Sequence, residues 1–392
     1  MTRYRRSPLA FFAFDDSLSF DPVALLRGAP PTSVVRSRIT AASIITGKHH
    51  DLTPDELEVL GSIPADQWSE ADAIDRLLLD HLVSCGLLIS DAPTTVATDL
   101  RKRHEALSAT AWNREAALYH YMTQWSGIRL AEDSEDLADV ADAAARRHAA
   151  AHGPCPGPFP EVPVARTIAL PAAERTEPLY RTLVSRRTTR AYDLSRSVTV
   201  AQLDTILRYV FGCLGHASSA MGTTLIRRTS PSAGALHAIE AYPLISGVSD
   251  IAPGLYHYRV ADHSLGLVRE LEKATARQLA TTFMCGQRHL GTAHVSFVLT
   301  ARFDRSYWKY REHPRAYAAL LMDAAHLSQT LQLVSTDLGL GAFVTLVVNG
   351  VDIERELGLE SAREGVIAMV GCGTPAETPA PLDLAFAPGP PR

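Results

Sequence analysis

Apolar positions in the first hundred residues recur at helical spacing and predict two helices. Thr53 and Glu56 have the spacing of a capping box, with proline at the first helical position, which predicts a short helix to about Leu60. A second apolar stripe predicts a helix that opens between Ser69 and Asp72. Both helices are short enough to belong to one small module.

A strand is expected to follow the second helix, and the order of these elements suggests a known type of module. The helix should stop at Gly86, and Leu87–Ile89 should continue as a strand. Helix, turn, helix and strand indicate a winged-helix-like module over residues 1–95. Arg76 is the only lysine or arginine on the second helix, so DNA readout is not expected. The edge strand could instead accept a peptide by strand addition, or the module could pack without a ligand.

The middle of the chain predicts a connector and a boundary. Two helices are expected over about Asp99–Trp125 and Glu135–His152, and they form a helical connector over residues 96–152. Closely spaced prolines follow and predict an extended linker over residues 153–175. A second proline-rich segment, residues 376–392, forms the tail of the chain.

Between residues 176 and 375 the strand and helix patterns alternate unevenly. Thr199 and Gln202 have the spacing of another capping box and predict a helix after them. The expected strands are His237–Ile245, Gly254–Val260, Leu265–Leu271, His294–Arg302 and Gly365–Cys372. A long helix over Arg315–Leu338 is apolar on most faces, as expected for a helix buried in a core or a subunit interface. Uneven alternation favours an α+β fold over a regular βαβ array.

Composition excludes several classes of protein. A chain of 392 residues suggests two or three domains, and its formal net charge of −5 argues against non-specific binding to nucleic acid or anionic membrane. Five scattered cysteines without a CxxC pair indicate a reducing compartment and no zinc site. The first apolar run is too short for a signal peptide, and no run approaches the ~18 residues of a membrane span. We therefore expect a cytoplasmic protein.

Two motifs could bind a ligand. Ser185–Tyr192 reads SRRTTRAY, and its guanidinium and hydroxyl donors suit a phosphate dianion as well as they suit a solvated basic turn. Pro231–Tyr242 reads PSAGALHAIEAY, whose small residues let a flat ring approach the backbone, although such loops are common. Neither GxGxxG nor GxxxxGK[ST] occurs, so a Rossmann or P-loop site has no support.

The third motif, Ser306–Tyr317, reads SYWKYREHPRAY and allows four interpretations. It could be a solvated basic loop, a nucleic-acid patch, a helix start whose aromatic residues pack inward, or a proton-handling pair beside a substrate. The acidic balance of the chain removes most support for the nucleic-acid interpretation.

Taken in order, the motifs resemble one family. The segment ending at Lys309–Tyr310 reads LTxRxxRxxxKY, and it accompanies SRRTTRAY, PSAGALHxIE and the helix RAYxxLLxDxxHxxQ. This order resembles the SagB-type azoline dehydrogenases, which are FMN enzymes of the nitroreductase fold in ribosomal peptide maturation. The resemblance covers about residues 176–375. It implies a nitroreductase-like domain with an antiparallel-rich sheet flanked by helices. The winged-helix-like module expected from the order of elements in residues 1–95 precedes this domain.

The resemblance also implies roles for particular residues. The segment that holds the FMN phosphate matches Arg186, Arg187, Thr188 and Arg190. The loop along the isoalloxazine matches Pro231, Ser232, Ala233, Gly234 and Ala235. The pair implicated in oxidising the azoline ring matches Lys309 and Tyr310. The loop that approaches the flavin N5 side resembles Val344, Thr345 and Leu346. No basic residue lies between Arg363 and Arg392, where many nitroreductase-fold proteins place one, so the arginine segment must bind more of the phosphate.

The implied activity is FMN-dependent oxidation of thiazolines or oxazolines to azoles in a precursor peptide. The implied partners are that peptide, a cyclodehydratase or other maturation enzymes, and a second copy of the chain. Charge, hydropathy and residue spacing argue against nucleic acid, membrane and metal. The alternatives are an NAD(P)H-dependent nitro- or quinone-type reductase, another peptide-modifying dehydrogenation, and a peptide-binding protein without catalysis.

Overall fold

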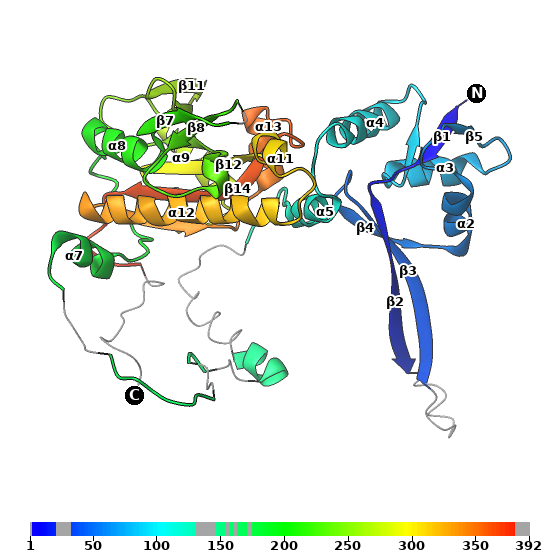
Figure 1. The fold of residues 1–392 in the computed structure, drawn as a ribbon, viewed down its shortest axis with the longest axis horizontal. Helices are drawn as coiled ribbons and strands as arrows, with labels where there is room; N and C mark the ends of the chain where they lie inside the picture. The colour runs from blue at the N-terminus through cyan, green and yellow to red at the C-terminus, as the bar shows by residue number, and fades with distance from the viewer. Residues whose placement is uncertain are drawn as a thin grey trace. The chain divides into compact units, whose positions relative to one another are not determined.

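The computed structural model describes residues 2–20, 33–130, 146–153, 157–159, 163–170, 175–220 and 222–380. The chain forms two compact units, and neither is continuous in sequence (Figure 1). Unit 1 comprises Met1–Gln124, Arg302–Ala319 and Leu359–Gly365. Unit 2 comprises Trp125–Ala301, Leu320–Gly358 and Val366–Arg392. The segment that ends in Lys309 and Tyr310 therefore folds with the N-terminal part of the chain.

A three-stranded sheet and two helices form the start of unit 1. The strands are β1 (Arg3–Arg6), β5 (Ser69–Glu70) and β6 (Leu88–Ser90), in the order β5-β1-β6, and the helices are α2 (Pro54–Ser62) and α3 (Arg76–Ser84). The predicted capping box at Thr53 is present, since Glu56 N–H donates to Thr53 Oγ1 over 3.3 Å. Leu60, Leu79, Leu82 and Leu87 are buried in the shared core. This arrangement is consistent with a winged-helix-like module.

The second helix starts later than the sequence pattern predicts. Ser69 and Glu70 pair with β1, so they are strand residues and not helix residues. The side chain of Asp75 accepts the N–H of Leu77 over 3.0 Å and caps α3 there. The local pattern could not distinguish the two starts because the competing interaction comes from β1.

A long hairpin in unit 1 is absent from the sequence-based prediction. Strands β2 (Ala10–Phe20) and β3 (Ser33–Ser43) pair antiparallel along their whole length, and β4 (Lys48–Leu52) pairs only with the end of β3 (Figure 1). The start of β2 reads AFFAF, and this continuous apolar run hides the period of two that identifies a half-buried strand.

The connector is broken into shorter helices than predicted. A single helix over Asp99–Trp125 is wrong, because α4 (Thr95–Ser108) ends and α5 (Arg114–Thr123) begins with its own cap. The Asn113 side chain accepts the N–H of Ala116 over 2.9 Å. Residues 146–152 are helical, whereas residues 135–145 of the predicted helix lie outside the described residues. Parts of the proline-rich linker and most of the tail also lie outside them.

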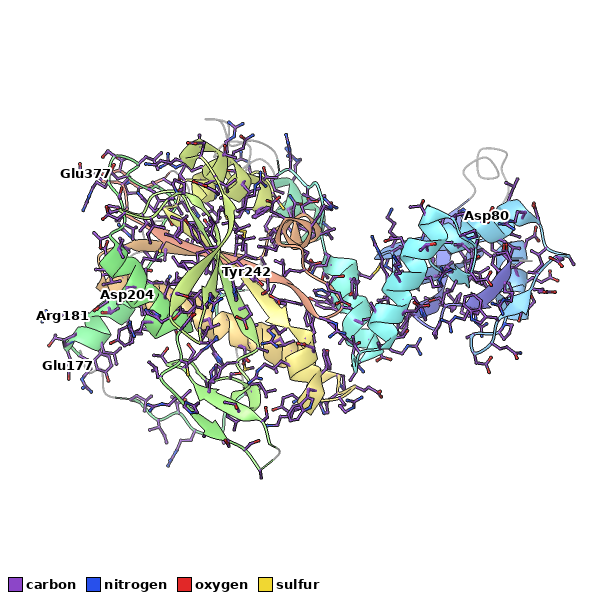
Figure 2. The ribbon with its side chains drawn as sticks, turned by 90° about the horizontal axis from the view of Figure 1, so that it is seen from above. Asp80, Glu177, Arg181, Asp204, Tyr242 and Glu377 are labelled. Carbon is purple, nitrogen blue, oxygen red and sulfur yellow. The ribbon has the colours of Figure 1, made fainter. Side chains whose placement is uncertain are left out.

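Unit 2 is built on a six-stranded sheet whose order is β11-β10-β9-β12-β14-β13. Its strands are β9 (Ile239–Ile245), β10 (Gly254–Arg259), β11 (Ser264–Glu270), β12 (Val295–Arg302), β13 (Gly341–Thr345) and β14 (Glu364–Gly373). β9 pairs antiparallel with β10 and β12, and β13 pairs antiparallel with β14. Tyr242 marks β9 in Figure 2. Five of these strands match the predicted ones to within two residues.

Helices surround this sheet and complete the α+β fold, as predicted. They are α7 (Pro178–Ser185), α8 (Val200–Ile206), α9 (Lys273–Phe283), α10 (Arg288–Gly291), α12 (Arg315–Asp337) and α13 (Gly350–Leu357). α8 begins at the predicted capping box, where Gln202 N–H donates to Thr199 Oγ1 over 3.1 Å, and continues as a π-helix over Leu207–Phe211. A small hairpin, β7 (Gly215–Ser218) with β8 (Thr224–Arg227), precedes β9. Within the described segments, no helix combines the length and apolarity needed to cross a membrane.

Candidate functional site

The loop between β8 and β9 has an unusual backbone. Residues Ala233–Ala235 form one 3₁₀ turn, in which Gly234 has a φ of 60°. Ala235 and His237 also have positive φ, at 55° and 47°, a region that costs residues with a Cβ roughly 1–3 kcal/mol each. Ala235 and His237 therefore adopt backbone conformations that are unfavourable for residues with a Cβ. Such strain concentrates at ligand-binding segments, and this is the loop that the sequence assigns to a flat ring.

Asp323 of α12 holds this loop in place. Its Oδ2 accepts the hydroxyl of Ser232 over 2.5 Å, and its Oδ1 accepts the N–H of Ala233 over 3.2 Å. The same Ser232 hydroxyl accepts the N–H of His237 over 2.9 Å. Asp323 is only 6% exposed, and burial raises the pKa of its carboxyl while the hydrogen bonds from the loop oppose that rise. One buried carboxylate thus fixes both ends of the turn.

Two more residues on the same face of α12 extend the contact. His326 Nδ1 lies 3.3 Å from the carbonyl oxygen of Pro231, and Thr330 Oγ1 lies 2.6 Å from Ser230 Oγ. Positions three and seven residues after Asp323 share its side of a helix. Helix α12 therefore contacts each residue of the segment 230–233. Sequence reasoning missed Asp323, although it is the acidic residue in the helix motif RAYxxLLxDxxHxxQ.

A buried arginine lies just before the loop. Arg228 is 6% exposed, its Nη1 donates to the carbonyl of Ile239 over 3.1 Å, and its Nε has no hydrogen-bond partner among the described residues. Burial lowers the pKa of this guanidinium, while the nearby carboxylates of Glu240 and Asp323 act in the opposite direction. Glu240 and, more weakly, Asp323 therefore offset part of the cost of burying this cation.

The arginine segment lies beside the first residues of β13. It follows α7, whose N-cap residue Glu177 and helix residue Arg181 are labelled in Figure 2. Arg186 Nη1 donates to Gln332 Oε1 over 2.8 Å, and Thr189 N–H donates to Ala342 O over 2.9 Å. A Cβ added to Gly341 would lie 2.4 Å from Thr189 Oγ1, so only glycine permits this approach. The segment is thus extended and fixed.

The other members of the arginine segment differ in exposure. Thr188 forms a parallel bridge with Ala342, Arg187 is exposed, and Arg190 is half-buried. Since the neutral amide of Gln332 accepts from Arg186, that contact leaves the charge of the guanidinium uncompensated. The donor set therefore suits a phosphate dianion.

The predicted loop at Val344, Thr345 and Leu346 is partly wrong. Val344 and Thr345 belong to β13, because they pair with Val370 and Met369 of β14, and only Leu346 follows the strand. Thr345 Oγ1 accepts the N–H of Val347 over 3.1 Å, and Gln287 Nε2 donates to Val347 O over 3.2 Å. Leu346 is 72% exposed. These hydrogen bonds fix the end of β13, and the apolar side chain of Leu346 faces solvent.

Lys309 and Tyr310 lie in unit 1, at the end of α11 (Phe303–Lys309). Tyr310 N–H donates to Ser306 O over 3.0 Å, and Lys309 Nζ lies 5.4 Å from the centre of the Tyr310 ring. Both side chains are partly exposed, whereas Tyr307 is buried and Trp308 is exposed. The segment Ser306–Lys309 is therefore the last turn of a helix that packs Tyr307 inward and leaves Lys309 and the following Tyr310 accessible.

Unit 2 holds the three segments assigned to the flavin, and unit 1 holds the lysine–tyrosine pair. Gln332 contacts the arginine segment and Asp323 contacts the 231–235 loop, from positions about two and a half turns apart along α12. No group of three histidine, cysteine or acidic residues in the described ranges has the arrangement of a metal site.

Comparison with known proteins finds one matching family and two relatives of similar sequence. Residues 183–374 match the nitroreductase family. The trifolitoxin-processing protein TfxB of Rhizobium leguminosarum bv. trifolii is 28% identical over 144 residues, which are 36% of this chain and 38% of TfxB. A nitroreductase homologue from Methanocaldococcus jannaschii is 29% identical over 174 residues, covering 44% of this chain and 80% of the homologue.

Two solved structures are also similar. The E. coli microcin synthetase McbBCD complex, with truncated pro-MccB17 bound, aligns with a TM-score of 0.41 and 20% identity over 62% of this chain and 93% of the matched chain. A nitroreductase homologue from Ralstonia eutropha aligns with a TM-score of 0.40 and 25% identity over 53% of this chain and 89% of that one.

Proposed function

Because residues 183–374 form a nitroreductase-family domain, we propose that this chain is an FMN-dependent oxidoreductase that oxidises azolines to azoles in a ribosomally made precursor peptide. The observation that carries the proposal is the strained loop of small residues held by the buried carboxylate of Asp323. A rigid backbone without bulky side chains is what a flat ring system needs beneath it. Peptide maturation is supported by the similarity to TfxB, a toxin-processing protein, over 38% of its length.

The residues of unit 2 fit an FMN by their chemistry. Arg186, Arg187, Thr188 and Arg190 would hold the phosphate, with guanidinium and hydroxyl donors on a fixed extended segment. Pro231, Ser232, Ala233, Gly234 and Ala235 would lie along the isoalloxazine. Val344, Thr345 and Leu346 would approach the N5 side from the end of β13. When bound, the flavin supplies a hydride acceptor, which is the redox chemistry that protein side chains lack.

Lys309 and Tyr310 would handle the proton lost from the azoline ring. Making the ring aromatic removes a hydride and a proton from neighbouring atoms, so a base is needed besides the hydride acceptor. A lysine amine or a tyrosine phenolate can accept that proton when it lies within hydrogen-bond reach of the ring carbon. Both side chains are partly exposed, so a peptide can reach them.

The winged-helix-like module and the uncharged face of α12 are the proposed partner surfaces. The module would engage the precursor peptide or another maturation enzyme such as a cyclodehydratase. Met322, Ala325 and Gln329 are exposed along one side of α12 and carry no charge, with Met322 60% exposed. A second copy of the chain would cover this face in a homodimer with a large interface.

An anaerobic reduction experiment separates the proposal from a general flavin reductase. We expect an azoline-containing precursor peptide to bleach the flavin absorbance of the FMN-loaded protein, with loss of two hydrogens from the peptide by mass spectrometry. NAD(P)H should bleach the flavin much more slowly. Rapid bleaching by NAD(P)H without any by the peptide would contradict azoline oxidation and favour the nitro- or quinone-reductase alternative, in line with the 29% identity to the M. jannaschii homologue.

A further inference from the structure

Helix α11 is attached at both ends to distant parts of unit 1. At its start, Phe303 N–H donates to Arg363 O over 2.7 Å. Just past its end, Glu312 N–H donates to Ala111 O over 2.8 Å. Glu312 has a φ of 52°, so the turn there adopts a backbone that a residue with a Cβ rarely takes. Ala111 lies in the connection between α4 and α5, so this connection is hydrogen-bonded to the segment that carries Lys309 and Tyr310.

Trp112, the residue after Ala111, fills the space between these two attachments. Its ring centre lies 4.3 Å from that of Phe303 and 4.9 Å from that of Tyr307, both on α11. Its Nε1 donates to Ala362 O over 3.0 Å, next to the residue that accepts from Phe303. Trp112 is 6% exposed. One side chain thus packs against α11 and hydrogen-bonds to the segment where α11 starts.

The rings around Trp112 are closely packed and uncharged. The Tyr317 ring lies 5.9 Å from it, and the Tyr317 hydroxyl lies 3.0 Å from Nδ1 of the buried His120. Burial lowers the pKa of His120 to about 3, so the imidazole is neutral at ordinary pH. Tilted aromatic pairs at these separations have a preferred geometry, which a merely apolar contact lacks.

Helix α11 cannot fix its own position. It has seven residues, and helices this short are not stable in water without tertiary contacts. Lys309 ends the helix, and Tyr310 follows in the turn that Glu312 anchors. The placement of these two side chains therefore depends on the contacts that Trp112 and Ala111 make.

We propose that Trp112 is a positioning residue for Lys309 and Tyr310, and that the region before residue 125 supports the chemical step as well as recognition. This inference rests on the proposed proton-handling role of the pair. Removing the ring would let α11 shift while leaving the flavin segments of unit 2 unaltered. Because misplacing a catalytic group by about 1 Å can cost ~10²-fold, the effect should fall on the chemical step.

The test compares three variants of the full chain loaded with FMN. Trp112→Ala should retain FMN and lower kcat for peptide oxidation by about 10- to 100-fold, with KM changed less than about threefold. Trp112→Phe, which keeps a ring, should recover most of kcat. Leu82→Ala is the matched control, because it opens a cavity in the core of the same unit around α3 and should leave kcat unaltered. If Trp112→Ala does not fold, Trp112→Leu takes its place.

Hydrogen exchange supplies a readout that does not require activity. Amides of residues 303–313 should exchange at least about tenfold faster in Trp112→Ala than in the wild type or Leu82→Ala. Unaltered exchange there, or an equal loss of kcat in Leu82→Ala, would overturn the proposal. If the wild type oxidises no azoline, the proposed function fails, and exchange in residues 303–313 still decides whether Trp112 positions the helix.

Discussion

Lys309→Ala and Tyr310→Phe are expected to keep bound FMN and to slow peptide oxidation by about 10²- to 10⁴-fold, the usual contribution of a general base. Both side chains lie at the exposed end of α11, in unit 1, whereas the segments assigned to FMN lie in unit 2. Loss of the pair should therefore leave the cofactor in place. Lys309→Ala should be the more severe change, because it removes an amine and also the cation 5.4 Å from the Tyr310 ring.

Single-turnover oxidation of an azoline peptide, followed by mass spectrometry, measures this effect. Arg311→Ala is a matched control, because it removes an exposed cation one residue beyond the pair. It should oxidise the peptide at a rate near that of the wild type. Full activity in both Lys309→Ala and Tyr310→Phe would make the pair an ordinary surface feature. Loss of FMN in both would show that they support the fold of the site.

Asp323→Ala should have the largest effect on the flavin itself. It removes the acceptor for Ser232 Oγ and Ala233 N–H, and it removes one of the two carboxylates near the buried Arg228, which keeps Glu240. Losing two hydrogen bonds to a buried carboxylate, at about 1.5–3 kcal/mol each, costs roughly 3–6 kcal/mol. If a third of that cost falls on the ordered loop, FMN should bind roughly tenfold more weakly, since ~1.4 kcal/mol corresponds to a factor of ten.

Flavin content per chain and the FMN dissociation constant measure this prediction, together with the melting temperature. Asp337→Ala, which removes an exposed carboxylate from the end of the same helix, is the matched control and should bind FMN like the wild type. Asp323→Ala with the affinity of the wild type for FMN would show that the carboxylate does not order the loop for the ring.

Features encoded by neighbouring residues could be predicted from the sequence. The capping boxes at Thr53 and Thr199 satisfy helix ends with side chains three residues away, so their signal is local. Strands β9, β12 and β14 are strongly apolar, and α12 ends within one residue of its predicted limit. The motifs of the candidate site were visible for the same reason, since each occupies a short stretch.

Features that depend on distant partners could not be predicted. Ser69 and Glu70 became strand residues only because β1 pairs with them. Asp323 looked like an isolated acid in a helix, since its partners lie about ninety residues earlier in the chain. The grouping of residues 302–319 with the N-terminal part depends on Trp112 and Ala111, and no local pattern in SYWKY reports those contacts.

The most direct test of the central claim is size-exclusion chromatography of the purified chain with flavin absorbance and light scattering recorded together. We predict a yellow protein that releases FMN on denaturation and whose flavin-bearing peak has the mass of two chains. A flavin-bearing peak with the mass of one chain would contradict the homodimer alone. A colourless protein that takes up no added FMN would contradict the flavin site at residues 186–190 and 231–235, and with it the proposed oxidation of azolines.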